Sequence, residues 1–492
     1  MKILMVYPDF ENTFWSFKKI LRFLGKKAAF PPLGLLTIGG MLPAHWEKKL
    51  VDMNIDKIEE KDIIWADYVF VSAMIVQKNA AKKVIALAHS LGKPVLAGGP
   101  LFTTGYEDFH EVEHLVLGEV EDYFHKVIKD LEEGKPKKMY QSTGFPSVSR
   151  SVIPDWSLIK PSDYNSMCIQ FSRGCPFNCE FCDVVQLNGR VPRLKSVEQI
   201  LREMDSIYKG GWRAGVFFVD DNFIGNKVKL KKYYLPAIIK WQKERNYPIS
   251  FNTQVSINLA DDKELIGLLV NAGFTSVFVG IETPDTGGLE ECGKIQNKNR
   301  DLLESVKIMQ NGGLEVQGGF IVGFDSDQPS IFQQQIDFIQ QSGIVTAMVG
   351  ILTALPKTRL YQRLKNANRL LTKASGNNVN STSLNFIPKM DTDTLLKGYQ
   401  KVLTTIYSPQ LYYTRIKNLL MEYKPVKLKA NKIRFYHIRA LISSLWILGV
   451  RQKGRSHFWK LLTWSLIKKP SMFPYAIGFS LVGLHFRSIA LA

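Results

Sequence analysis

Residues 1–140 alternate short apolar runs with longer stretches typical of helices. The apolar runs are Ile3–Tyr7, Tyr68–Ala73, Pro94–Gly98 and His114–Leu117, and the helical stretches lie near Pro32–Leu42, Gln77–Leu91 and Val120–Leu131. Continuous Val, Ile and Leu runs are typical of parallel strands covered on both faces, and the crossovers between such strands need helices. The pattern therefore predicts a doubly wound α/β domain, whose ligand should bind at the carboxyl ends of the strands.

A second series of β/α repeats begins near Met167, after a Pro- and Ser-rich stretch that predicts a linker over residues 141–165. We expect strands over Cys168–Phe171, Gly215–Val219, Ile249–Thr253, Ser276–Ile281, Val316–Val322 and Thr346–Leu352, with helices over Val197–Gly210, Lys229–Asn246, Asp261–Ala272, Asn299–Asn311 and Gln328–Ser342. Strands that alternate with helices in this way fit a partial (β/α)6 barrel over residues 166–370. Functional groups in such barrels belong at the carboxyl ends of the strands.

The chain changes character from about residue 370. Leu371–Asn385 is polar and loop-like, whereas Asp391–Tyr407 and Pro409–Glu422 read as helices. The sequence thus predicts a helical region over residues 371–424, followed by a tail over residues 425–492. Two apolar stretches of the tail, Ile438–Val450 and Phe473–Phe486, are shorter than the roughly 20 residues that a membrane-spanning helix needs.

Positive charge is concentrated in this tail. The net charge is +19, and thirteen Lys and Arg but no Asp or Glu follow Glu422. Trp446, Trp459 and Trp464 are interleaved with those basic residues, a pattern that favours a helix lying in a membrane interface. A basic helical pair packed on the barrel is the alternative, and the high apolar content argues against nucleic acid as a partner.

The five cysteines do not predict a disulfide framework, because their number is odd and three of them are clustered. Cys175, Cys179 and Cys182 follow the spacing Cys-x3-Cys-x2-Cys, and Gly174 and Pro176 suit a tight loop around them. Thiolates are soft ligands for zinc or iron–sulfur clusters. A structural zinc site needs a fourth ligand, and none lies nearby in the sequence. Free thiols and the lack of a signal-peptide pattern at the N-terminus predict a cytoplasmic protein.

The cysteine spacing, with Phe181 directly before the last cysteine, resembles the cluster loop of radical S-adenosylmethionine (radical SAM) enzymes. The resemblance implies a 4Fe-4S cluster held by the three cysteines, SAM bound to its open iron, a TIM-like barrel, and a reductant such as flavodoxin or ferredoxin. Phe181 would then lie near the adenine, and Asp220 and Asp221 would accept hydrogen bonds from the SAM amino group. Gln254 and Glu282, at other strand ends, are further candidates for contact with SAM or the substrate, or for a supporting role.

The N-terminal segment resembles the Rossmann-like cobalamin-binding domain of a large radical SAM subclass. Its landmarks are Pro31–Leu35, Ser72–Met74, Gly98–Pro100 and Gly118–Glu121. By this resemblance the cobalamin-binding candidates are Ser72, Met74, Gly98, Gly99, Gly118 and Glu119. The Asp-x-His-x-x-Gly motif that supplies a lower-ligand histidine is absent, so cobalamin would bind without a protein histidine. A related domain that has lost its cofactor is the alternative.

Two further stretches, Asn188–Arg193 and Val219–Asn226, resemble the radical SAM branch that includes hopanoid C-2 methylases. The resemblance implies a cobalamin-dependent methyltransferase that acts on an unactivated carbon through a 5′-deoxyadenosyl radical. The basic, apolar C-terminus favours an apolar or lipid-like substrate. A non-methylating radical SAM enzyme, such as an oxidative cyclase, and a cobalamin- or redox-sensing module at a membrane stay open. A methylthiotransferase is disfavoured because residues 1–150 contain no cysteine.

Overall fold

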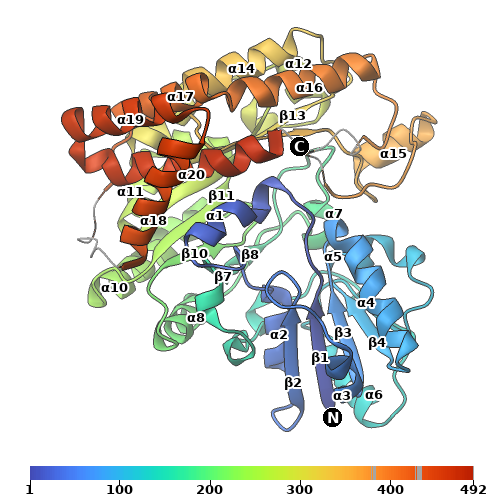
Figure 1. Cartoon of the computed structure of the whole chain (residues 1–492). Helices are drawn as coiled ribbons and strands as arrows, with labels where there is room; N and C mark the ends of the chain where they lie inside the picture. Colours follow the sequence, from blue (N-terminus) through green and yellow to red (C-terminus); the bar gives the residue numbers. More distant parts are fainter. Residues whose placement is uncertain (378, 380–383, 427, 429–434, 491–492) are drawn as a thin grey trace.

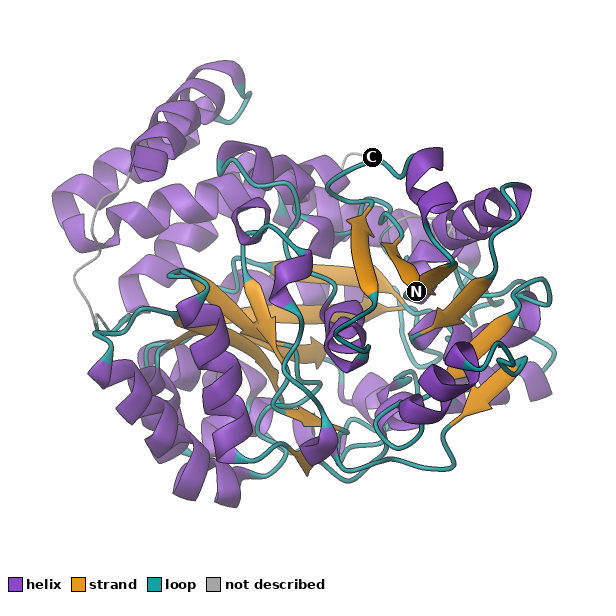
Figure 2. Cartoon of the chain, turned by 90° about the horizontal axis from the view of Figure 1, so that it is seen from below, coloured by secondary structure: helices purple, strands orange, loops and turns teal. Residues whose placement is uncertain are grey.

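The computed structural model describes residues 1–377, 379, 384–426, 428 and 435–490. Within them the chain forms two six-stranded parallel sheets and a two-stranded antiparallel ribbon, β8 (Ser172–Arg173) with β9 (Arg193–Leu194). The strands lie in the interior and helices form the outer layers (Figure 2). The N-terminal sheet, in blue, and the second sheet, in green and yellow, lie side by side, and the C-terminal helices pack on the second (Figure 1).

The N-terminal sheet has the strand order β2-β1-β3-β4-β5-β6. Its strands are β1 (Lys2–Tyr7), β2 (Glu47–Asp52), β3 (Tyr68–Ser72), β4 (Val95–Gly98), β5 (His114–Leu117) and β6 (Met139–Gln141), and its helices are α2 (Leu33–Met41), α3 (Glu60–Trp65), α4 (Lys78–Ser90), α5 (Pro100–Gly105) and α6 (Phe124–Glu132). The four predicted strands are present. The sequence missed β2 and β6, which form the two edges of the sheet. An edge strand has one neighbour and tolerates charged side chains, so neither strand carries a continuous apolar run.

The second sheet follows the predicted barrel, with the order β14-β13-β12-β11-β10-β7. Its strands are β7 (Met167–Ile169), β10 (Gly215–Phe218), β11 (Ser250–Val255), β12 (Phe274–Glu282), β13 (Glu315–Val322) and β14 (Ala347–Ile351). The covering helices are α8 (Val197–Lys209), α9 (Lys227–Lys229), α10 (Leu235–Glu244), α11 (Lys263–Ala272), α12 (Thr286–Glu291), α13 (Leu302–Asn311) and α14 (Ile331–Ser342). No pairing joins β7 to β14 in the described part of the chain, so the barrel is partial, as predicted.

One predicted helix is interrupted. Lys229–Asn246 was expected to be continuous, but a π-helical turn, Leu230–Tyr234, separates α9 from α10. Pro236 is the second residue of α10, the helix that follows. Proline has no N–H to donate, so the hydrogen-bond ladder shifts by one residue before it.

The C-terminal helices cover one side of the barrel. They are α16 (Thr392–Ile406), α17 (Pro409–Glu422), α18 (Phe435–Trp446), the π-helical turn η11 (Ile447–Arg451), α19 (Arg455–Lys468) and α20 (Phe473–Ala490). Phe486 of α20 stacks on Tyr407 at 5.3 Å and lies 5.4 Å from Phe14, ring centre to ring centre, so the segment at Phe14 packs on the last helix. Residues 378 and 380–383 of the predicted loop, and 427, 429–434 and 491–492 of the tail, lie outside the described residues.

None of the described helices is both long and apolar enough to cross a lipid bilayer.

Candidate active site

A cavity of about 1370 Å³ lies between the two sheets. Its lining comes from the carboxyl ends of β1, β3, β4 and β5 on one side and of β10, β11, β12 and β13 on the other. Pockets for drug-sized ligands usually measure about 300–1000 Å³, so this cavity has room for more than one such ligand. Both sheets therefore present their expected binding edge to the same space.

The six residues predicted to bind cobalamin, Ser72, Met74, Gly98, Gly99, Gly118 and Glu119, all line this cavity. Gly99 has a φ of +88°, and a Cβ there would lie 2.6 Å from Ser72 Oγ. The turn after β4 therefore requires glycine and presents bare backbone to the cavity. A wide space edged by glycine turns fits a large planar cofactor such as a corrinoid. That each of these residues contacts cobalamin stays a prediction.

Glu119 is also part of an ion-pair network that joins the two domains. Its carboxylate accepts hydrogen bonds from Arg173 Nη1 and Arg193 Nη1, both at 2.8 Å. Glu121 Oε1 lies 2.7 Å from Arg173 Nη2, and the two side chains are 1% and 15% exposed. Burial opposes ionisation of Glu121, but the charge of Arg173 outweighs it and lowers the pKa of that carboxyl. No local pattern pairs these arginines with the Gly118–Glu121 motif, because 54 residues separate Glu119 from Arg173.

The three clustered cysteines lie in a loop that the β8–β9 ribbon closes at its base. Gly174 has a φ of +98°, and a Cβ there would come within 2.8–3.0 Å of three carbonyl oxygens. The chain needs glycine there to reach Cys175, whose N–H donates to Gly189 O at 3.2 Å. All five cysteines are free, and burial raises the pKa of the Cys175 and Cys182 thiols. Three soft donors in one glycine-shaped loop fit the 4Fe-4S cluster that the resemblance implied.

The two predicted carboxylates after β10 lie in different surroundings. Asp221 lines the cavity and accepts a hydrogen bond from Asn188 Nδ2 at 2.9 Å. Asp220 is fully buried and is not part of the cavity lining. It accepts from Phe171 N at 3.0 Å, Ser172 Oγ at 2.6 Å and Ser172 N. Burial nevertheless raises the pKa of Asp220 to about 7. Of the two, Asp221 alone faces the cavity, whereas Asp220 holds the chain that leads into the cysteine loop. A hydrogen bond from the SAM amino group to either carboxylate stays a prediction.

Glu282 and Gln254 both line the cavity from neighbouring strands. Glu282 has a φ of +65°, which is rare for a residue other than glycine and costs about 1–3 kcal/mol. Its Oε1 lies 2.5 Å from Lys294 Nζ, and both side chains are largely buried. The charge of Glu282 raises the pKa of Lys294 although burial opposes it. Lys294 was not a sequence candidate, because nothing in its local pattern marks it as buried.

Phe181, like the three clustered cysteines, is not part of the cavity lining. Its ring packs 6.4 Å from that of Phe324, in an apolar cluster that also contains Cys292. A contact of Phe181 with adenine stays a prediction.

The two sheets thus face one cavity: the glycine turns of the N-terminal sheet line it, and the three-cysteine loop follows the first strand of the second sheet without lining it. This is an α/β protein with candidate cofactor sites on both sheets. Family models match the B12 binding domain over residues 27–128 and the Radical SAM superfamily over residues 169–369. A third family, described as a domain of unknown function (DUF4070), matches residues 358–492.

Curated relatives and a solved structure agree with these matches. An uncharacterized methyltransferase, sll1242, of Synechocystis sp. is 39% identical over 99% of this chain and 91% of the relative. A hopanoid C-2 methylase of Rhodopseudomonas palustris is 34% identical over 95% of this chain and 90% of the relative. The structure of the cobalamin-dependent SAM radical enzyme OxsB, with aqua-cobalamin and SAM bound, has a TM-score of 0.65, with 15% identity, over 100% of this chain and 79% of OxsB.

The chain belongs to the family of radical SAM enzymes with a cobalamin-binding domain, and it is a cobalamin-dependent radical SAM methyltransferase. The predicted α/β fold class and the three predicted cofactors, the 4Fe-4S cluster, SAM and cobalamin, are therefore confirmed.

Proposed function

We propose that the enzyme methylates an unactivated carbon of an apolar, lipid-like substrate. The observation that carries this proposal is the aromatic lining of the shared cavity. Trp15 lies 5.0 Å from Phe278 and Phe30 lies 5.1 Å from Phe217, ring centre to ring centre, and all four residues line the cavity. Each pair joins a ring of the N-terminal domain to one of the barrel. An apolar substrate held there would lie between the cobalamin-binding domain and the barrel, where contact with the aromatic rings would stabilise it and exclude water.

The relative named hopanoid C-2 methylase supports the same substrate class. When bound, the cluster supplies the electron that cleaves SAM, and cobalamin carries the methyl group. The chain's own residues hold and orient these partners. Asp221 would accept a charge-assisted hydrogen bond from the ammonium group of SAM, a role that its position in the cavity lining beside Glu282 supports. We propose a small redox protein such as flavodoxin or ferredoxin as the source of electrons.

The test is an anaerobic assay with methyl-labelled SAM, cobalamin and a reductant, run in parallel on an apolar lipid extract and on a polar cell extract. We expect label in a lipid whose mass has increased by one methylene group. Cys179→Ala is the matched negative control. Deoxyadenosine without label transfer would contradict methylation and favour an oxidative cyclisation. Label only in the polar extract would contradict the apolar substrate.

We also propose that the C-terminal tail docks the enzyme on an anionic membrane surface, where a lipid-like substrate resides. On α18 and η11, the side chains of Ile442, Trp446 and Val450 repeat every fourth residue and are 62%, 58% and 47% exposed. Trp459, Leu466 and Ile467 of α19 are exposed as well. Trp459 Nε1 donates to Gly449 O at 2.9 Å, so the two apolar surfaces are adjacent.

Charge supports an anionic surface as the partner. Exposed basic side chains flank the apolar ones: Arg451, Lys453, Arg455, Lys460 and Lys468. No acidic residue follows Glu422. Lys and Arg near an anionic membrane contribute about 1 kcal/mol each.

Flotation of the full chain with anionic and with neutral vesicles tests the docking. We expect binding to anionic vesicles that Trp446→Ser with Ile467→Ser weakens at least about tenfold. The control is Val228→Ser, which removes an apolar side chain that is 73% exposed on the barrel. Equal flotation of the double variant and the control would refute the tail as the docking surface.

A further inference from the structure

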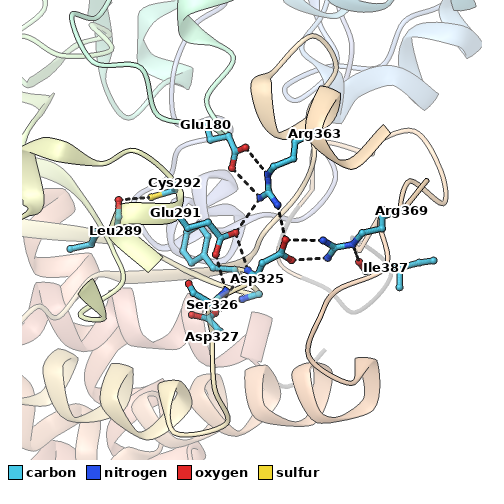
Figure 3. Close-up of polar contacts among 12 residues, drawn as sticks. Glu180, Leu289, Glu291, Cys292, Asp325, Ser326, Asp327, Arg363, Arg369 and Ile387 are labelled. Atoms are coloured by element: carbon cyan, nitrogen blue, oxygen red, sulfur yellow. Dashed lines mark hydrogen bonds and ion pairs between the residues drawn. The ribbon is translucent and has the colours of Figure 1, made fainter. Parts of the chain in front are cut away.

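We infer that Arg363, on α15 (Arg359–Asn366), positions the cluster loop from outside the barrel. The inference rests on the assignment of Cys175, Cys179 and Cys182 as cluster ligands and does not depend on the substrate. Glu180 lies between two of these cysteines, and its side chain is 10% exposed. Arg363 Nε and Nη2 donate to the two Glu180 carboxylate oxygens at 2.7 and 3.0 Å, a two-point contact that fixes both position and orientation (Figure 3).

The backbone of the loop is bound by the same helix. Leu360 N donates to Glu180 O at 3.0 Å, and Arg359 Nη1 donates to Asn178 O at 3.1 Å. On the opposite side, Glu180 N donates to Cys292 O at 2.8 Å. The turn between Cys179 and Cys182 is therefore fixed at its backbone on both sides and at its one acidic side chain.

Arg363 is itself held in place by carboxylates of the barrel. Its Nη1 donates to Asp325 Oδ2 at 2.6 Å and its Nη2 to Glu291 Oε1 at 3.1 Å (Figure 3). Arg369 binds both oxygens of Asp325 at 2.7 Å. Asp325 and Glu291 are 7% and 16% exposed, so these charges are mostly out of water. Without Arg363, Asp325 would keep Arg369 and Glu291 would keep two backbone N–H donors, whereas Glu180 would lose its one ion-pair partner among the described residues.

The contacts of Arg363 with Glu180, Asp325 and Glu291 form a clamp on the cluster loop. The need for this clamp follows from the position of the three cysteine ligands in one loop. Three sulfurs from one eight-residue loop must keep a fixed mutual geometry, and the loop has little secondary structure to impose it. Contacts one layer outside metal ligands orient those ligands, and losing them typically costs about 10- to 100-fold in metal affinity. Residues 358–492 match a domain of unknown function, so the clamp also gives the first helix of that region a role at the cluster.

The test is the rate at which reconstituted enzyme loses iron to a chelator, measured without SAM, cobalamin or substrate, together with the EPR spectrum of the reduced cluster. We expect Arg363→Ala to release iron about tenfold faster. We expect Arg363→Lys to lie between it and the wild type, because lysine keeps the charge but not the two-point contact. Lys365→Ala, which removes an exposed charge from the same helix, is the control and should match the wild type.

Glu180→Gln tests the other end of the contact and decides the matter if Arg363→Ala does not fold. It keeps the size of the side chain and removes its charge, so it should also release iron faster. Wild-type release rates and spectra in both variants would overturn the inference. So would faster release in Arg363→Ala alone, because the effect would then not act through Glu180. A clamp that behaves as expected in an enzyme that transfers no methyl group would overturn the proposed function only.

Discussion

Replacing Arg173 with Met should weaken the junction between the two domains. The guanidinium of Arg173 is shared by Glu119 and Glu121 of the cobalamin-binding domain. Glu119 keeps a second partner in Arg193, whereas Arg173 is the one ion-pair partner of Glu121 among the described residues. The substitution therefore leaves one buried carboxylate without an ion-pair partner. Removing one partner of a buried ion pair costs about 3–5 kcal/mol, and we expect a loss of that size in the free energy of unfolding.

The measurement is urea and thermal unfolding of the cofactor-free chain, followed by tryptophan fluorescence. For a domain of about 150–250 residues, a loss of this size should lower the midpoint temperature of unfolding by at least about 6 °C. Adding Glu121→Gln to Arg173→Met should restore about 2 kcal/mol, because the uncompensated charge is then gone. Arg150→Met is the control, since the Arg150–Asp122 pair is 65% and 44% exposed and should contribute less than about 1 kcal/mol.

The effect should also depend on pH with a definite sign. Because Arg173 lowers the pKa of Glu121 in the folded chain, the stability from this pair is present above the ordinary pKa of 4.5 and is lost as the pH falls below it. The difference between wild type and Arg173→Met should accordingly shrink in acid. A loss no larger than that of Arg150→Met at neutral pH would refute the argument, because it would mean that Glu121 is solvated in the folded protein.

Three further predictions concern single positions. Asp327 is 5% exposed, and burial raises its pKa to about 7. The stability that it contributes is therefore full below pH 4 and is lost as the pH rises through about 7, by up to about 4 kcal/mol. Asp327→Asn should make the free energy of unfolding less dependent on pH between pH 5 and 8, and an unchanged dependence would contradict this. Gly99→Ala should lower the cobalamin retained per chain, measured by absorbance, because its Cβ would collide with Ser72, whereas Gly92→Ala, with a similar positive φ but open space, should retain it. Alanine at Cys175, Cys179 or Cys182 should abolish the absorbance of the reconstituted cluster near about 400 nm, while Cys168→Ala and Cys292→Ala should keep it; loss in all five would mean that the assay reports folding instead of ligation.

Much of the fold could be predicted from the sequence because its causes are local. Buried strands such as β1 and β3 need apolar side chains on both faces, and that requirement appears directly as runs of Ile, Leu, Val and Phe. Edge strands such as β2 carry no such requirement and were missed. The short helix α15 was missed as well, because its eight residues have only two buried apolar positions, Leu360 and Leu364.

The features of the candidate site likewise divide into those that depend on neighbouring residues and those that depend on the tertiary structure. The sequence by itself determined the cysteine loop and the glycine turns, because ligand spacing and backbone conformation are properties of neighbouring residues. Only the tertiary structure decided that Asp221 faces the cavity while Asp220 binds Ser172, and that Glu119 and Glu180 each pair with a distant arginine. A buried carboxylate must find its partners in three dimensions, and 183 residues of chain separate Glu180 from Arg363. The cluster loop can therefore be predicted from the sequence, whereas the contacts that hold it in place form only in the folded structure.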